Sequence, residues 1–316
     1  MMRILPVVVA IAAVAALPMF GNNYVLRLGT MFAMYAVLAQ SWNIIGGYAG
    51  YPSFATAAFF GLGAYTGAIL QGAGVPMPLA WGAACLVAAA FAGVMGLAIL
   101  HLKGHYFAIA SLVLAEVLLE VTTSWTSLTG GGMGLNLPVI RMSVEAQARL
   151  FFWSMLTLAV LALIMSWLVA RGRVGFALQC IRQNEDASSM VGINTTLYKT
   201  IAFVLSGLLV GGAGAMYASW VFYIEPPDVY SVMTSIKPIV MVMLGGAGTV
   251  LGPVVGAAAF LVMEEVVWRN FLSIHAAVLG LTIVGLIFFL PNGIFGLIRK
   301  RRTGALPQLQ RKGETV

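Results

Sequence analysis

Residues 171–199 read Arg171-Gly-Arg-Val-Gly-Phe-Ala-Leu-Gln-Cys-Ile-Arg-Gln-Asn-Glu-Asp-Ala-Ser-Ser-Met-Val-Gly-Ile-Asn-Thr-Thr-Leu-Tyr-Lys199. They form the long, charge-bearing interruption between two blocks of sequence that are apolar enough to span a membrane. Within this segment, Asn184 can cap a helix that begins at Glu185, and Gly192 can end that helix. The pattern predicts a short surface helix, on the cytoplasmic side of a membrane, that docks on another protein.

The composition of the whole chain indicates a membrane protein. Of its 316 residues, 61% are hydrophobic and 9% are charged, whereas about a quarter of the residues of a soluble domain are charged. We therefore expect an all-α integral membrane protein whose main environment is the lipid bilayer. The net charge of +7 requires no nucleic-acid partner, because the basic residues lie at predicted membrane edges and in the C-terminal tail.

Apolar runs of the length needed for a membrane span recur along the chain. Each span needs about 17–25 mostly apolar residues. We predict about ten transmembrane helices, near residues 4–20, 25–45, 53–70, 79–100, 105–121, 150–170, 199–221, 229–245, 250–268 and 275–291. An alternative for residues 1–20 is a cleaved signal peptide, with Ala13-Val-Ala15 as its small-residue site.

The distribution of Lys and Arg orients these spans. A cytoplasmic N-terminus places twelve basic residues inside: Arg3, Lys103, Arg171, Arg173, Arg182, Lys199, Arg299, Lys300, Arg301, Arg302, Arg311 and Lys312. Four lie outside: Arg27, Arg141, Arg149 and Arg269. Because cytoplasmic loops carry the excess of Lys and Arg, we expect both termini in the cytoplasm.

This topology predicts one transmembrane domain over residues 1–302. Residues 122–149 form its main outer loop, residues 171–199 face the cytoplasm, and residues 303–316 are a polar tail that we expect to be disordered. The outer loops are too short to form a receptor domain.

No catalytic or cofactor motif is visible in the sequence. A Gly-x-x-x-x-Gly-Lys-Ser/Thr loop is absent, so the chain has no phosphate cradle of its own. The histidines His101, His105 and His275 lack metal-ligand spacing with cysteines or carboxylates, and no Ser/His/Asp arrangement can be read. We therefore expect no catalytic residues, no metal site and no cofactor in this chain, and transport is the remaining kind of activity.

A helix break is predicted where Gly46, Gly47, Gly50 and Pro52 interrupt a hydrophobic stretch. Irregular backbone at membrane depth is tolerated where it is buried in protein or lines a cavity, and broken helices often mark transport sites. Close helix packing on small residues explains the glycines equally well. The candidate residues for a translocation path here are Gln40, Asn43, Tyr48, Gly50, Ser53 and Thr56.

Ionisable residues inside predicted spans add Glu116 and Lys237 to that candidate path. Such residues are costly in a membrane and usually face the interior of a helix bundle. Glu120, Glu264 and Glu265 are further examples. They could form a polar lining or a proton relay, but a structural ion pair is favoured, and we predict that Lys237 pairs with one of these glutamates.

Several blocks occur in an order that resembles the branched-chain amino-acid ABC-transporter permeases of the LivM type, over about residues 25–297. The blocks are Gly47-Tyr-Ala-Gly with Ser53 and Ala57–Tyr65, Gly104-His-Tyr-Phe-Ala108 with Glu116, Thr129-Gly-Gly with Gly134-Leu135, Arg173 to Ile193, Gly245-Gly-Ala-Gly-Thr249 with Gly252-Pro253, and Leu290-Pro-x-Gly293. Each block is weak alone, and their joint order is specific.

The resemblance implies the permease subunit of an ATP-driven importer in the bacterial inner membrane. Residues 171–199 match the loop that couples such permeases to their ATPases, with the matching positions Arg173, Gly175, Arg182, Glu185, Ala187 and Gly192. The implied partners are two cytoplasmic ABC ATPases, which use ATP and Mg²⁺, a second related permease in a heterodimer, and a periplasmic solute-binding protein.

Some positions depart from the pattern of that family, so other substrates and mechanisms stay open. Tyr51-Pro52, Ala55-Thr56 and Lys237 replace residues more usual there. The same family also carries urea, amides and aromatic acids. An ion-coupled secondary transporter that uses Glu116 or Glu264 is the main alternative from another class, and a passive channel ranks last because it would gain nothing from a docking loop.

Overall fold

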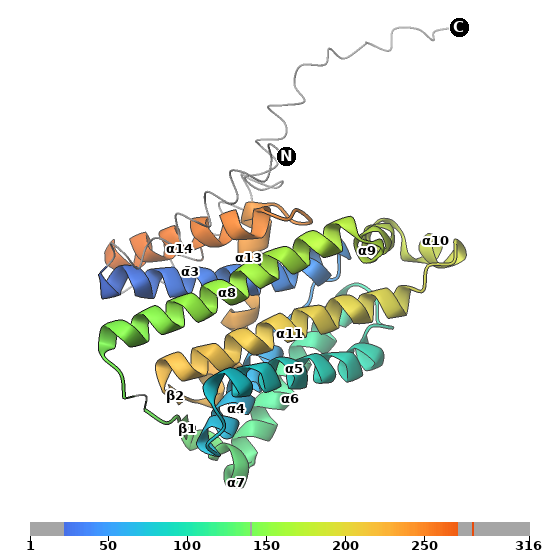
Figure 1. The fold of residues 1–316 in the computed structure, drawn as a ribbon. Coiled ribbons are helices and arrows are strands. Elements are labelled where there is room, and N and C mark those ends of the chain that lie inside the picture. Colours follow the sequence, from blue (N-terminus) through green and yellow to red (C-terminus); the bar gives the residue numbers. More distant parts are fainter. Residues whose placement is uncertain (1–21, 140, 271–279, 281–316) are drawn as a thin grey trace, which may run out of the picture.

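The computed structural model describes residues 22–139, 141–270 and 280, and these residues are mainly helical (Figure 1). In chain order the elements are α3 (Asn23–Trp42), the π-helix η1 (Asn43–Tyr48), α4 (Thr56–Gly72), α5 (Met77–Ile99), α6 (His105–Ser124), α7 (Thr126–Thr129), the 3₁₀-helix η2 (Gly131–Met133), β1 (Leu135–Asn136), α8 (Val144–Arg171), α9 (Arg173–Gln183), α10 (Glu185–Met190), α11 (Thr195–Val221), β2 (Tyr223–Ile224), α12 (Pro226–Val229), α13 (Val232–Gly245) and α14 (Gly252–Asn270).

Eight of the ten predicted spans correspond to these helices. The predicted spans at 4–20 and, apart from residue 280, at 275–291 lie outside the described residues. Six of the described helical segments are long and apolar enough to cross a membrane. The protein is therefore a helical membrane protein.

Helix α11 lies at the centre of the bundle and packs most extensively against α5 and α4. Glycines allow its backbone to approach α4 closely: a Cβ at Gly63 would lie 2.1 Å from the Gly211 carbonyl oxygen, and one at Gly214 would lie 2.1 Å from that of Phe60. Because lipid is as apolar as a side chain, association inside a membrane depends on such close van der Waals packing. The small residues of α4 and α11 thus hold the two helices together.

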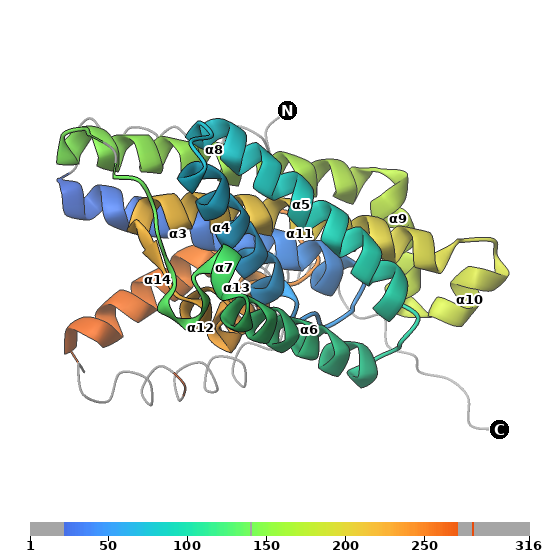
Figure 2. The same cartoon turned by 90° about the horizontal axis from the view of Figure 1, so that it is seen from below.

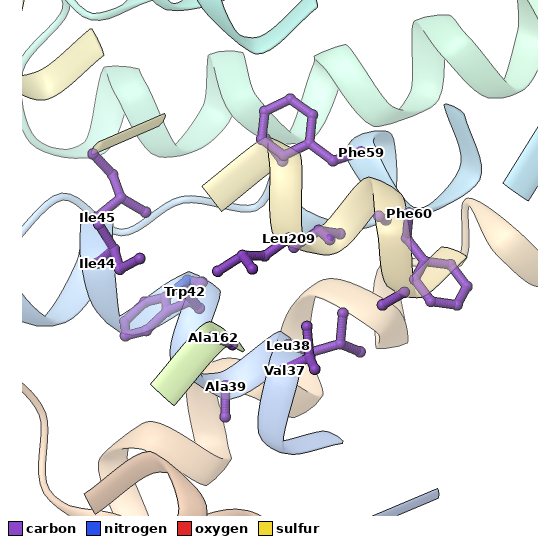
Figure 3. Close-up of a cluster of buried hydrophobic side chains, with 14 of the residues drawn as sticks. Val37, Leu38, Ala39, Trp42, Ile44, Ile45, Phe59, Phe60, Ala162 and Leu209 are labelled. Carbon is purple, nitrogen blue, oxygen red and sulfur yellow. The ribbon is translucent and has the colours of Figure 1, made fainter. Parts of the chain in front are cut away.

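The core is formed by apolar side chains from several helices (Figure 3). Trp42 and the residues before it on α3 pack beside Ile44 and Ile45 of η1, with Phe59 on α4 and Leu209 on α11. All of these side chains are buried. The core therefore surrounds the place where the first described helix changes from α3 to η1.

The bundle has two different ends (Figures 1 and 2). Helices α9 and α10 lie at one end, and α7, β1 and β2 lie at the other. The strands pair antiparallel, Leu135 with Ile224 and Asn136 with Tyr223. This pairing fixes the predicted outer loop, residues 122–149, to the segment that follows α11.

Candidate functional site

The surface helix predicted after Asn184 is confirmed as α10. The Asn184 Oδ1 atom accepts a hydrogen bond of 3.0 Å from the Ala187 backbone N–H, and Gly192 takes a φ of +89° just beyond the helix. A second helix, α9, precedes it, so the segment 171–199 contains two helices. Ala187 and Met190 on α10 and Val191 just after it are exposed and leave an open, partly apolar surface.

The predicted helix break consists of η1 and the irregular residues 49–55 that lead to α4. Its buried backbone is paired with side chains: the Trp42 indole donates to the Ser53 carbonyl oxygen at 2.8 Å, and the Phe54 N–H donates to Ser111 Oγ at 2.9 Å. Irregular backbone inside a membrane bundle requires such internal partners. Residues 43–55, called the break below, are thus held by neighbouring elements.

Two of the candidate path residues fix the break to the turn between α13 and α14. Asn43 donates to the Thr249 carbonyl oxygen at 2.9 Å and accepts from the Gly248 N–H at 2.8 Å. Gln40 donates to the Val250 carbonyl oxygen at 2.7 Å. Both side chains are fully buried. In this conformation their amides bond mainly to protein backbone, and they do not line an open channel.

A buried ion pair joins α10 and α11 to the break. The Lys199 ammonium donates to Glu185 Oε1 at 2.7 Å, to the Leu100 carbonyl oxygen at 2.6 Å and to the Tyr51 hydroxyl at 3.1 Å. The Tyr51 hydroxyl in turn donates to Glu185 Oε2. Lys199 is 1% exposed, and all three of its donors are used.

A second contact lies beside this pair. Arg182 at the end of α9 donates to the Gly47 carbonyl oxygen in η1 at 2.6 Å. We call Tyr51, Arg182, Glu185 and Lys199 the junction network. It connects the segment 171–199 to the break at two points, Gly47 through Arg182 of α9 and Tyr51 through Glu185 of α10, so a joint displacement of α9 and α10 would pull directly on residues 47–51.

The junction network perturbs the titration of two of its members. Burial by itself would raise the pKa of the Glu185 carboxyl, but hydrogen bonds from Lys199 and Tyr51 lower that pKa below its ordinary value. Burial and the neighbouring carboxylate raise the pKa of the Tyr51 hydroxyl. At neutral pH Glu185 is therefore charged and Tyr51 is a neutral donor, as the observed hydrogen bonds require.

Sequence reasoning missed the roles of Tyr51 and Lys199. It counted Lys199 only as a charge on the cytoplasmic side, and it noted Tyr51 only as a departure from the family pattern. The available signal was a lysine near the start of an apolar helix, which needs a carboxylate partner if it is buried. The sequence pattern also placed Glu185 in the docking surface, whereas the carboxylate of Glu185 is directed into the protein.

The remaining candidate residues lie in different surroundings. Tyr48, Ser53 and Thr56 are buried near the break, and Gly50 is exposed with a φ of +75°. Glu116 is exposed on α6, away from the break. Two further positions of the segment 171–199 that match the coupling loop of the family are Arg173, which is exposed, and Gly175, which is buried.

Lys237 pairs with a glutamate, as predicted, and the partner is Glu264. The Lys237 ammonium lies 2.8 Å from Glu264 Oε1 and donates to the Tyr35 hydroxyl at 2.9 Å. The three side chains belong to α13, α14 and α3 and border a cavity of about 590 Å³. In the described part of the chain, no three His, Cys, Asp or Glu side chains converge as metal ligands would.

Comparisons with known proteins give a consistent result. Residues 24–290 match the family described as branched-chain amino acid transport system / permease component. The chain is 26% identical to the high-affinity branched-chain amino acid transport system permease protein LivM of Salmonella typhimurium, over 91% of this chain and 73% of that protein. It is 26% identical to the LivM protein of Escherichia coli over 94% of this chain and 74% of that protein.

A more distant relative shares the same description. The chain is 22% identical to the probable branched-chain amino acid transport permease protein LivM of Methanocaldococcus jannaschii, over 74% of this chain and 78% of that protein. No solved structure matches the chain.

Proposed function

The chain belongs to the permease family of branched-chain amino-acid transport systems, and from that premise we propose that it is the pore-forming permease of an ATP-driven importer. Its substrates are branched-chain or related hydrophobic amino acids. The observation that carries this proposal is the family match over residues 24–290, joined by a surface helix, α10, whose Glu185 accepts a hydrogen bond from Tyr51 in a break of a membrane helix.

The exposed surface formed by Ala187 and Met190 of α10 and by Val191 just after it docks on one of the importer's two cytoplasmic ATPases. The ATPases bind ATP and Mg²⁺, since this chain has no phosphate-binding loop, and the chain itself is a transport subunit without enzymatic activity. ATP-driven closure of the ATPases moves α10. The junction network then transmits this movement to the break, which changes the accessibility of the translocation path.

The chain crosses the bacterial inner membrane about ten times, with both termini in the cytoplasm. This orientation puts α9 and α10 inside and puts β1, β2 and α7 outside, where the periplasmic solute-binding protein delivers the substrate. Residues 1–302 form one permease domain, and residues 303–316 form a cytoplasmic tail. The opposite positions of α10 and the β1–β2 pair in the bundle support this assignment (Figure 1).

A second, related permease covers the exposed face of α6 in a heterodimer. Glu116 lies midway along α6 and is exposed beside Val113 and Val117. A charged side chain at the centre of a span costs about 2.5–3.5 kcal/mol on insertion scales when it faces lipid. A polar partner surface removes that cost, so this face is better suited to another protein than to lipid.

The test is uptake by the complex that co-purifies with this chain from its native membrane in mild detergent. In proteoliposomes, labelled leucine should accumulate only with ATP and the solute-binding protein, and ionophores that dissipate ion gradients should not reduce the uptake. Uptake driven by a proton or sodium gradient without ATP would establish the secondary transporter instead. Competition by urea, amides or aromatic acids but not by leucine would reassign the substrate.

A further inference from the structure

A cavity of about 590 Å³ lies between α3, α11, α13 and α14, on the side of the bundle remote from α10. This volume falls within the range of about 300–1,000 Å³ that is typical of small-molecule sites. The wall of the cavity carries charges of both signs next to apolar side chains. Neither the family match nor the names of the relatives assigns a ligand to it.

The Lys237–Glu264 pair in this wall retains unused hydrogen-bonding capacity. A lysine ammonium has three donors, and two are used, for Tyr35 and Glu264. A carboxylate has about four acceptor positions, and Glu264 uses two of them, for Lys237 and Tyr35. The side chains of Lys237 and Glu264 are 29% and 17% exposed, whereas that of Lys199 in the junction network is 1% exposed.

Arg27 and Asp228 extend the charged wall of the same cavity. Both are exposed, and neither forms an ion pair with any of the residues that the structure describes. An arginine guanidinium binds a carboxylate through two parallel hydrogen bonds, and an aspartate accepts from an ammonium. The cavity thus offers two cations, Arg27 and Lys237, and two carboxylates with remaining capacity, Asp228 and Glu264. A third carboxylate in the wall, Glu265, accepts a hydrogen bond from the Tyr24 hydroxyl.

Apolar side chains complete the wall. They include Met31, Met34 and Leu38 of α3, Met233 of α13 and Leu261 of α14. Methionine side chains are flexible and polarisable, and they fit apolar groups of different shape. A ligand that uses all of these features carries one carboxylate, one ammonium and an apolar side chain. A purely structural ion pair would require neither Arg27 and Asp228 nor an apolar surface beside it.

We infer that this cavity binds an α-amino acid with an apolar side chain while it crosses the membrane. Lys237 and Arg27 hold its carboxylate, Glu264 and Asp228 hold its ammonium, and the methionine-rich wall holds its side chain. The inference rests on the proposed function. It adds a substrate site in this subunit to the separate site in the solute-binding protein.

The test uses the purified importer complex with a single reporter cysteine in this chain, Met31→Cys, in a Cys85→Ser and Cys180→Ser background. L-leucine should slow modification of the reporter by a thiol reagent. At a concentration of about ten times Kd, mass action leaves about one site in eleven free, so modification slows about ten-fold. The control is Met133→Cys, which replaces a side chain that is 83% exposed outside the cavity and should react at an unchanged rate.

Two leucine analogues test whether the cavity recognises both charged groups of the amino acid. 4-Methylpentanoate lacks the ammonium and 3-methylbutylamine lacks the carboxylate, and neither should protect the reporter at the concentration at which leucine does. Equal protection by all three compounds would reduce the site to an apolar cavity and overturn the inference. A charge-neutral variant, Lys237→Met with Glu264→Gln, should lose protection by leucine but keep the rate of modification measured without leucine.

Uptake by the same preparation separates this inference from the proposed function. ATP-driven leucine uptake without any protection of the reporter would overturn the cavity site and leave the importer in place. A wild-type complex, with Met31, Cys85 and Cys180 unchanged, that shows no ATP-driven amino-acid uptake would overturn the proposed function, and the site would fall with it.

Discussion

Replacing Glu185 with alanine would leave the Lys199 ammonium without the carboxylate that neutralises it. The Lys199 side chain is 1% exposed and that of Glu185 is 16% exposed, and their charged atoms lie 2.7 Å apart. Removal of one partner from a buried pair costs about 3–5 kcal/mol, because the remaining charge stays desolvated. Because Glu185 is partly exposed, we expect Glu185→Ala to lower the unfolding free energy by about 3 kcal/mol, the lower end of this range.

A double-mutant cycle isolates the interaction. Glu185→Ala, Lys199→Met and the double variant should be compared by equilibrium unfolding in mixed detergent micelles. Since the double variant leaves no unpaired charge, it should be more stable than the sum of the single effects predicts, with a coupling energy of about 2–3 kcal/mol. The matched control is Lys103 with Asp186, a pair at 2.6 Å whose side chains are 57% and 75% exposed, and this pair should show no resolvable coupling.

Additive effects at Glu185 and Lys199 would show that the two side chains do not form a coupled, buried ion pair. Transport provides an independent readout. If α10 acts on the break through the junction network, the double variant should still bind the ATPases but should hydrolyse ATP with reduced leucine uptake. Normal uptake per ATP in a correctly assembled double variant would contradict that role.

Three further predictions follow from the backbone and from the titration of the junction network. Gly63→Ala places a methyl group 2.1 Å from the Gly211 carbonyl oxygen and should lower the unfolding free energy by about 1–3 kcal/mol or more, whereas Gly72→Ala, with nothing within 4 Å, should not. Gly192→Ala puts a side chain at φ +89° and should lower the unfolding free energy by about 1–2 kcal/mol, measured by thermal unfolding of the detergent-solubilised protein. The pH dependence of unfolding should differ between the wild type and Glu185→Gln. The wild type should have the higher unfolding free energy above pH 4.5, the ordinary pKa of a glutamate carboxyl. This difference should disappear as the pH falls through the lowered pKa of Glu185 in the folded state.

The membrane-spanning helices were largely predictable because each depends on its own run of apolar residues. The cap at Asn184 and the glycine after α10 were predictable for the same reason, since both act through neighbouring backbone. Helix α9 was missed although its buried residues Ala177, Leu178 and Ile181 recur at helical spacing, because the cap at Asn184 and the glycine at 192 mark only the later helix, α10.

The partners of the charged residues could be predicted only in part. The cost of a lysine inside a span indicated that Lys237 needs a glutamate, but the choice of Glu264 depends on how α13 packs on α14. Tyr51 and Lys199 are 148 residues apart, and only the packed bundle brings them together. Glu116 is exposed because α6 lies at the edge of the bundle, which no local pattern reveals.

The most direct test of the account is photo-cross-linking from two ends of the bundle. A photoreactive amino acid at Met190 on α10 and, in a separate variant, at Met133 beside β1 replaces side chains that are 86% and 83% exposed. If α10 is the docking site, Met190 should cross-link to the ATPase subunit and Met133 should not. Cross-links to the ATPase from Met133, or their absence from Met190 in a complex that retains the ATPases, would contradict docking on α10.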